Sequence, residues 1–82
     1  MLTTLDKLDI NACGKIESIA ACGSMRRRLL DLGFVKNTEV KCLGRSPLGD
    51  PSAYMVRGAV VAMRKRDALN VFISVLPEIS GE

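Results

Sequence analysis

The chain has 82 residues, of which 48% are hydrophobic and 26% are charged. A chain of this length fills one core and has little left for a deep pocket, which argues against most enzyme classes. Its 12 basic and 9 acidic residues give a net charge of +3, which is too mild and too mixed to indicate a dedicated polyanion-binding surface.

Histidine is absent from the sequence, which removes the commonest metal ligand and the side chain best suited to proton exchange near neutral pH. The three cysteines, Cys13, Cys22 and Cys42, are widely spaced and form no C-x-x-C pair, so neither a disulfide framework nor a zinc site is indicated. The acidic residues are scattered, which argues against a hard-cation site. We expect free thiols, no metal site, no cofactor, and Cys42 in the core.

The N-terminal segment has no basic region followed by an apolar run, and no stretch approaches the roughly 18 apolar residues of a membrane span. No repeat or linker-like stretch divides the sequence. We therefore expect a cytoplasmic protein with one domain over residues 1–82, of which the polar tail 77–82 frays.

The first part of the chain predicts one strand followed by one helix. Residues 15–21 have the length and the β-branched residues of a strand, but their alternation is imperfect and requires a bulge. Ser24 is the expected N-cap of the helix, and Gly33 is expected to end it in a left-handed conformation, with Phe34 packing back on the last turn. The apolar residues that recur at i, i+4 and i+7 form one stripe of this helix: Met25, Leu29 and Leu32.

The rest of the chain predicts four more strands. Residues 38–45 alternate with the period of two that is typical of a half-buried strand, with Val40 and Cys42 on the inner face. Two prolines exclude the loop 46–51 from a sheet ladder, and Gly58 offers a tight reversal. The other expected elements are strands over residues 53–57, 59–64 and 71–76, and a helical turn over residues 66–70.

These elements predict a mainly β fold with one short helix after the first strand and a helical turn before the last strand. Five short strands are too few for a sandwich, and closure into a small barrel removes the sheet edges that would otherwise aggregate. We therefore predict a five-stranded SH3-like barrel.

Four blocks of sequence together resemble the FeoA family. Residues 25–34, with three arginines and a Leu-Gly-Phe exit, resemble that family's arginine-leucine helix. The loop 46–51 is similar to its Pro-Leu-Gly-Asp-Pro loop, and residues 56–58 and 62–65 look like its next hairpin. Each block alone is a common helix end, turn or strand end, but the order and spacing of all four agree over nearly the whole chain.

One departure is Lys36-Asn37, where the family often has Pro-Gly after the helix exit. Asparagine is the non-glycine residue that best accepts a left-handed turn conformation, so we expect the turn to survive at Asn37.

The resemblance implies a cytosolic SH3-like accessory protein of bacterial ferrous iron uptake, whose partner is FeoB, a membrane permease with a cytosolic GTPase domain. An iron-transport role does not require that iron binds to this chain. The same domain type also resembles the C-terminal module of iron-dependent repressors of the DtxR kind, so a regulatory module is an alternative. An enzyme is not expected, because no nucleophile is paired with a base and no Gly-rich phosphate cradle occurs.

The proline loop is the best single candidate for a partner-binding surface. Its two prolines stiffen it, and its apolar tip therefore loses little entropy when it docks. An equally weighted alternative places Leu48 under the loop as a cap on the barrel, with Asp50 in an Asx-type turn. The partner-binding candidates in this segment are Pro47, Leu48, Gly49, Asp50 and Pro51.

Arg26, Arg27 and Tyr54 complete the set of partner-binding candidates. The three arginines 26–28 fan around the helix at about 100° per residue, which favours a solvated helix face over a docking face. We expect Tyr54 to share the docking surface with Leu48.

Two further interpretations concern other partners. Small barrels bind nucleic acid and the sequence pI is about 9.0, but Phe34, Tyr54 and Phe72 are the only aromatic residues and two of them suit packing better than base stacking. We therefore expect no nucleic-acid partner. The high apolar fraction for so short a chain leaves weak self-association as a second hypothesis.

Overall fold

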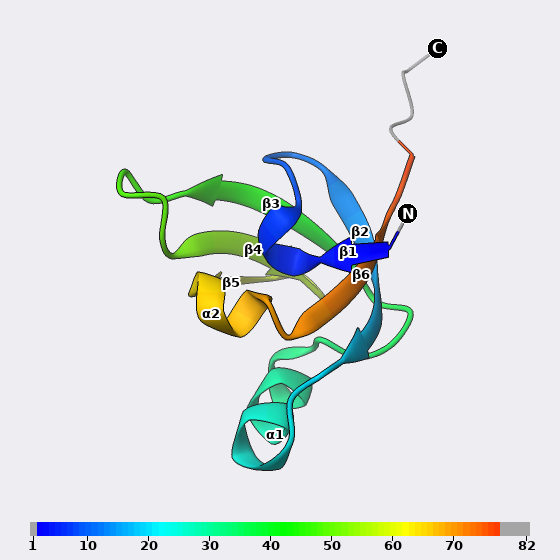
Figure 1. Ribbon diagram of the computed structural model, residues 1–82. Helices are drawn as coiled ribbons and strands as arrows, with labels where there is room; N and C mark the ends of the chain where they lie inside the picture. The colour runs from blue at the N-terminus through cyan, green and yellow to red at the C-terminus, as the bar shows by residue number, and fades with distance from the viewer. Residues whose placement is uncertain (1, 78–82) are drawn as a thin grey trace.

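The computed structural model describes residues 2–77, which form an antiparallel sheet with short helices between its strands (Figure 1). The elements, in chain order, are β1 (Leu2–Thr4), the 3-10 helix η1 (Leu5–Lys7), β2 (Cys13–Ile19), α1 (Gly23–Leu32), β3 (Glu39–Arg45), β4 (Ser52–Val56), β5 (Ala59–Met63), α2 (Lys65–Ala68) and β6 (Val71–Val75). Residues 78–82 of the expected frayed tail lie outside the described residues.

The sheet has six strands in the order β1-β6-β2-β3-β4-β5. The prediction of five strands in a closed barrel is therefore wrong in two respects. Strand β1 was missed because its three residues carry no periodic pattern, and it forms only by pairing with β6, from Leu2 opposite Ser74 to Thr4 opposite Phe72. Closure fails because β1 and β5 do not pair within residues 2–77, and they remain the two edges of the sheet.

Strand β2 contains the predicted bulge. Its pairing with β6 shifts register between Ile16 and Ser18, which allows Ile16 to be fully buried in spite of the imperfect alternation. The strand spans Cys13–Ile19 and not residues 15–21, because it pairs with β3 from Cys13 onward.

Helix α1 begins two residues earlier than predicted and ends as predicted. Its N-cap is Cys22 and not Ser24, because the chain already turns into the helix at Gly23, which has a φ of 64°. At the other end, Gly33 has a φ of 110° and its N–H donates to the carbonyl oxygen of Leu30 at 3.0 Å. The N–H of Phe34 donates to the carbonyl oxygen of Leu29 at 3.0 Å, and these two bonds together make a Schellman motif.

The core contains the apolar stripe of α1 and the inner faces of the strands. Leu29 is buried, and Met25 and Leu32 pack partly buried against the same cluster, so the predicted stripe is confirmed. The expected burial of Cys42 and the left-handed conformation of Asn37, with a φ of 74°, are confirmed as well. The largest fully buried side chains are Tyr54, Phe34, Leu5, Leu8, Ile16, Leu29, Ile73, Val40, Val56, Val71 and Cys42.

The helices are short, and among residues 2–77 no helix is long and apolar enough to cross a membrane. In Figure 1 the loop between β3 and β4 projects from the sheet on the side away from β1 and β6, and α2 lies between that loop and α1.

Candidate protein-interaction surface

The loop 46–51 is held in shape by two hydrogen bonds within it. The N–H of Gly49 donates to the carbonyl oxygen of Ser46 at 2.8 Å, which closes a β-turn with Pro47 and Leu48 at its corners. The N–H of Ser46 donates to the carbonyl oxygen of Pro51 at 3.0 Å and joins the two ends of the loop. Gly49 has a φ of 87°, a conformation that favours glycine.

Leu48 stands at the tip of this loop with 94% of its surface exposed. The alternative in which Leu48 folds under the loop is therefore wrong. No other large apolar side chain among the described residues is as exposed. A leucine presented on a hydrogen-bonded turn is typical of a contact residue, because the backbone of the turn does not have to be ordered on docking.

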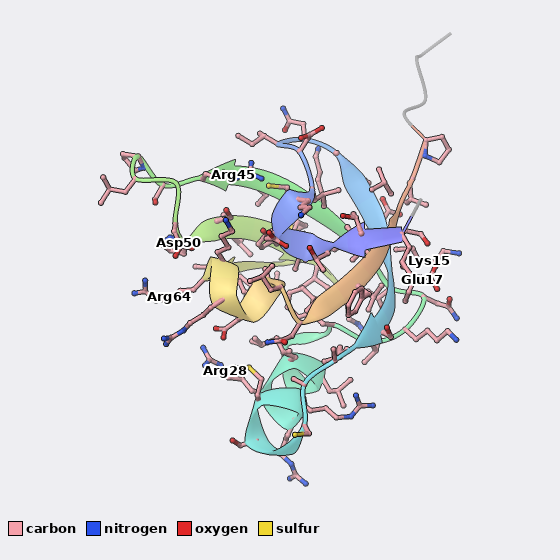
Figure 2. All side chains as sticks on the ribbon, viewed as in Figure 1. Lys15, Glu17, Arg28, Arg45, Asp50 and Arg64 are labelled. Atoms are coloured by element: carbon pink, nitrogen blue, oxygen red, sulfur yellow. The ribbon has the colours of Figure 1, made fainter. Side chains whose placement is uncertain are left out.

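Asp50 anchors the base of the loop to helix α2. Its Oδ1 accepts a hydrogen bond of 2.8 Å from the backbone N–H of Lys65, the first residue of α2. The expected Asx-type turn is replaced by this longer-range contact, which satisfies an N–H that has no partner within the helix. Figure 2 shows Asp50 between the loop and α2. Asp50 therefore fixes the position of the loop.

Tyr54 is buried, with 1% of its surface exposed, so its assignment to the docking surface is wrong. In β4 the inward side chains alternate, and Tyr54 lies on the same face as Ser52 and Val56. Its hydroxyl donates to the carbonyl oxygen of Leu5 at 3.4 Å, and burial raises the pKa of the phenol above its ordinary value. The tyrosine packs the sheet against η1.

The arginines of α1 are exposed, as predicted. Nη1 of Arg26 donates to the carbonyl oxygen of Ile19 at 3.4 Å, which directs this side chain toward the end of β2. Arg27 is exposed as well, and Figure 1 shows helix α1 separated from the loop between β3 and β4 by α2. The structure therefore does not bring these two candidates together with the loop.

A groove that the sequence did not indicate lies where α1, β5 and α2 meet, with a volume of about 280 Å³. Its apolar lining comes from the stripe of α1 and from Ala62 and Met63 of β5, and Pro51 at the base of the loop also lines it. The charged residues that line it are Arg28, Arg64, Arg66 and Asp67. The sequence signal was the two arginine-rich clusters 26–28 and 64–66, which are separate in the chain and meet only in the fold.

The cysteines are free and differ in exposure. Cys42 is buried, Cys22 is exposed, and Cys13 lies between these extremes. Burial raises the pKa of the Cys13 thiol, and a hydrogen bond with Glu39 raises it further. Among residues 2–77, no three Cys, Asp or Glu side chains gather closely enough to hold a metal ion.

The family model for the FeoA domain matches residues 3–75. No curated protein is significantly similar to the chain. Among solved structures, the FeoA protein from Chlorobium tepidum is 32% identical to this chain, with a TM-score of 0.86 over 98% of this chain and 76% of its own.

Stenotrophomonas maltophilia FeoA in complex with zinc is 30% identical, with a TM-score of 0.79 over 88% of this chain and 89% of its own. That protein is described as an SH3 domain protein and a candidate activating factor of bacterial ferrous iron transport. A manganese-dependent transcriptional repressor shares the fold at 17% identity, with a TM-score of 0.81 over 92% of this chain and 42% of its own.

Proposed function

This chain belongs to the FeoA family, and we propose that it is a cytoplasmic, non-enzymatic accessory protein that docks on a FeoB-type ferrous iron permease through the loop 46–51. The family is related to accessory proteins of ferrous iron transport. The single observation that carries the docking proposal is Leu48, exposed at 94% on a loop with internal hydrogen bonds.

The energetic argument rests on this leucine. Fully burying a leucine side chain contributes about 2 kcal/mol, or about a 30-fold change in affinity. Because the turn is already closed by the Gly49-to-Ser46 bond, little of this gain is lost to ordering the loop. Asp50 holds the loop on α2, so its docked position is defined in the free protein.

Nucleic acid is a weaker candidate partner. Phe34 and Tyr54 are buried, which removes two of the three aromatic side chains from base stacking. A salt-dependent contact with phosphates through the arginines is the remaining way in which nucleic acid could bind.

The docking proposal is tested by titrating the isotope-labelled protein with the soluble cytosolic GTPase domain of the permease from the same organism. We expect chemical-shift changes at residues 46–51, and we expect Leu48→Glu to weaken binding by at least about 30-fold. Val60→Glu is the matched control, because Val60 is 64% exposed on β5, away from the loop.

Equal affinities of Leu48→Glu and the unmodified protein would refute the role of the loop. A duplex DNA arm at two salt concentrations completes the test, since broad, salt-sensitive shifts with DNA and none with the GTPase domain would replace this proposal by nucleic-acid binding.

A further inference from the structure

The groove between α1 and α2 combines an apolar lining with a positively charged rim. Six apolar side chains line it: Met25, Leu29 and Leu32 from α1, Ala62 and Met63 from β5, and Pro51 from the loop. Met25 and Leu32 are only partly buried, so part of the apolar stripe of α1 is open to a ligand. Figure 2 shows Arg28 on α1 and Arg64 before α2 on the same side of the molecule.

The rim carries a net positive charge. Three arginines, Arg28, Arg64 and Arg66, line the groove against one carboxylate, that of Asp67. Elsewhere the guanidinium groups of Arg26 and Arg45 donate to backbone carbonyl oxygens. Within the described part of the chain, the guanidinium groups of the three rim arginines have no such acceptor.

The size of the groove limits its occupant. A volume of about 280 Å³ is at the lower limit of the roughly 300–1,000 Å³ of pockets that hold a drug-sized molecule. The groove therefore suits a few side chains of a peptide better than a cofactor. Apolar side chains would cover the open part of the stripe, and carboxylates would meet the arginines as charge-assisted hydrogen bonds.

We propose that this groove binds an acidic amphipathic segment of a partner protein, with its apolar side chains on Met25, Leu32 and Ala62 and its carboxylates on the rim arginines. Charge complementarity selects this occupant over a basic or neutral helix. The inference rests on the proposed function in one respect only, namely that the partner is the permease.

The probe is a synthetic peptide of about three helical turns with leucines on one face and glutamates on the other, and its counterpart has lysine at every glutamate position. Each is titrated into the isotope-labelled full chain. We expect the acidic peptide to shift the signals of Met25, Leu32, Ala62 and Met63, with an affinity at least about tenfold higher than that of the basic peptide.

Charge variants separate the effect of the rim arginines on peptide affinity from the effect of the protein's net charge. The double variant Arg28→Glu, Arg64→Glu should weaken binding of the acidic peptide by about tenfold or more. A matched double variant, Lys36→Glu with Lys41→Glu, makes the same change in net charge at exposed residues that do not line the groove, and it should leave the affinity nearly unchanged. Equal weakening by both double variants, or equal binding of the two peptides, would overturn the proposal.

A second pair of variants tests the apolar lining. Ala62→Glu places a carboxylate in the groove at an exposed position of β5 and should abolish peptide binding, whereas Val60→Glu on the same strand should not. Unchanged binding by Ala62→Glu would overturn the proposal. Self-association of the protein through the groove would also overturn the proposal. It would appear as a rise in sedimentation coefficient with protein concentration before peptide is added.

The GTPase domain of the permease is then titrated into the same variants. Binding that Ala62→Glu abolishes supports both the groove and the proposed partner. Binding that Ala62→Glu leaves intact supports the partner and contradicts the groove as its site. Binding of the acidic peptide without binding of the domain supports the groove and contradicts the proposed partner.

Discussion

Oδ1 of Asp50 accepts a hydrogen bond of 2.8 Å from the backbone N–H of Lys65, so the loop after β3 and the start of α2 are joined across 15 residues of sequence. A four-residue helix has few hydrogen bonds of its own, and a carboxylate at its N-terminus also interacts favourably with its dipole. The hydrogen bond between Asp50 and Lys65 therefore positions both the proposed docking loop and one wall of the groove.

Asp50→Ala should destabilise the protein by about 1 kcal/mol, because the N–H of Lys65 loses its acceptor. Asp50→Asn retains a side-chain oxygen at the same place, so its free energy of unfolding should be closer to that of the unmodified protein. Urea unfolding of the three proteins measures both differences. If the alanine and asparagine variants are equally stable, the hydrogen bond does not contribute as described.

Gly14→Ala should be destabilising, whereas Gly44→Ala should be nearly neutral. A Cβ at Gly14 would lie 2.8 Å from Cδ1 of the fully buried Ile73, so the core must shift, at a cost of about 1–3 kcal/mol. A Cβ at Gly44 meets nothing within 4 Å. Thermal unfolding followed by circular dichroism compares the two. Equal melting temperatures would mean that Ile73 accommodates the added methyl group freely.

Tyr54 should make the protein less stable at alkaline pH. Burial raises its pKa above the ordinary value of 10.0, so the folded state favours the neutral phenol. The preference of the folded state for the neutral phenol contributes fully to the free energy of unfolding below pH 10.0. This stabilisation is lost as the pH rises through the folded-state pKa. Tyr54 is the only tyrosine and tryptophan is absent, so near-ultraviolet absorbance of tyrosinate follows this group alone.

The comparison for this prediction is Tyr54→Phe. At neutral pH it should cost less than about 1 kcal/mol, because it removes only a long hydrogen bond to Leu5. Above pH 10.0 its free energy of unfolding should fall less steeply than that of the unmodified protein. If the free energy of unfolding of the two proteins fell equally with pH, Tyr54 would not be the group responsible for the alkaline loss of stability.

The three cysteines should react with iodoacetamide in a fixed order. Cys22 is exposed and should be alkylated first. Cys13 should follow slowly, because burial and Glu39 raise its pKa and reduce the fraction present as thiolate at neutral pH. Cys42 is fully buried and should react only when the protein unfolds. Mass spectrometry of timed digests gives the order, and early labelling of Cys42 would contradict the packing.

Local patterns in the sequence predicted the elements whose formation depends on neighbouring residues. The stripe of Met25, Leu29 and Leu32 and the exit at Gly33 are set within one helix, and both were confirmed. Strand β1 depends on β6, which lies about 70 residues away in sequence, so no local pattern marks it. The Tyr54 error has a local cause, since its shared face with Val56 was already visible in the spacing of the strand.

The groove was beyond sequence reasoning for a similar reason. Arg28 and Arg64 belong to two basic clusters that are far apart in the sequence, residues 26–28 on a helix and residues 64–66 directly before Asp67. Their common rim exists only because β5 and α1 meet, which is a property of the tertiary fold. The loop is different, because its prolines and its apolar tip are contiguous and mark it as a candidate, but the sequence left the exposed and the folded-under positions of Leu48 equally weighted and the structure decided between them.

The position of β6 in the sheet determines when the sheet can form during synthesis. Among the strands of residues 2–77 it is the last to be synthesised, yet it lies between the first two, β1 and β2, and hydrogen-bonds to both. While β6 is still inside the ribosome, β1 has no neighbour and β2 is paired only with β3. This part of the sheet therefore assembles only after Val75 has emerged. A chain that terminates before Val71 loses two strands from its sheet, although only one has been deleted.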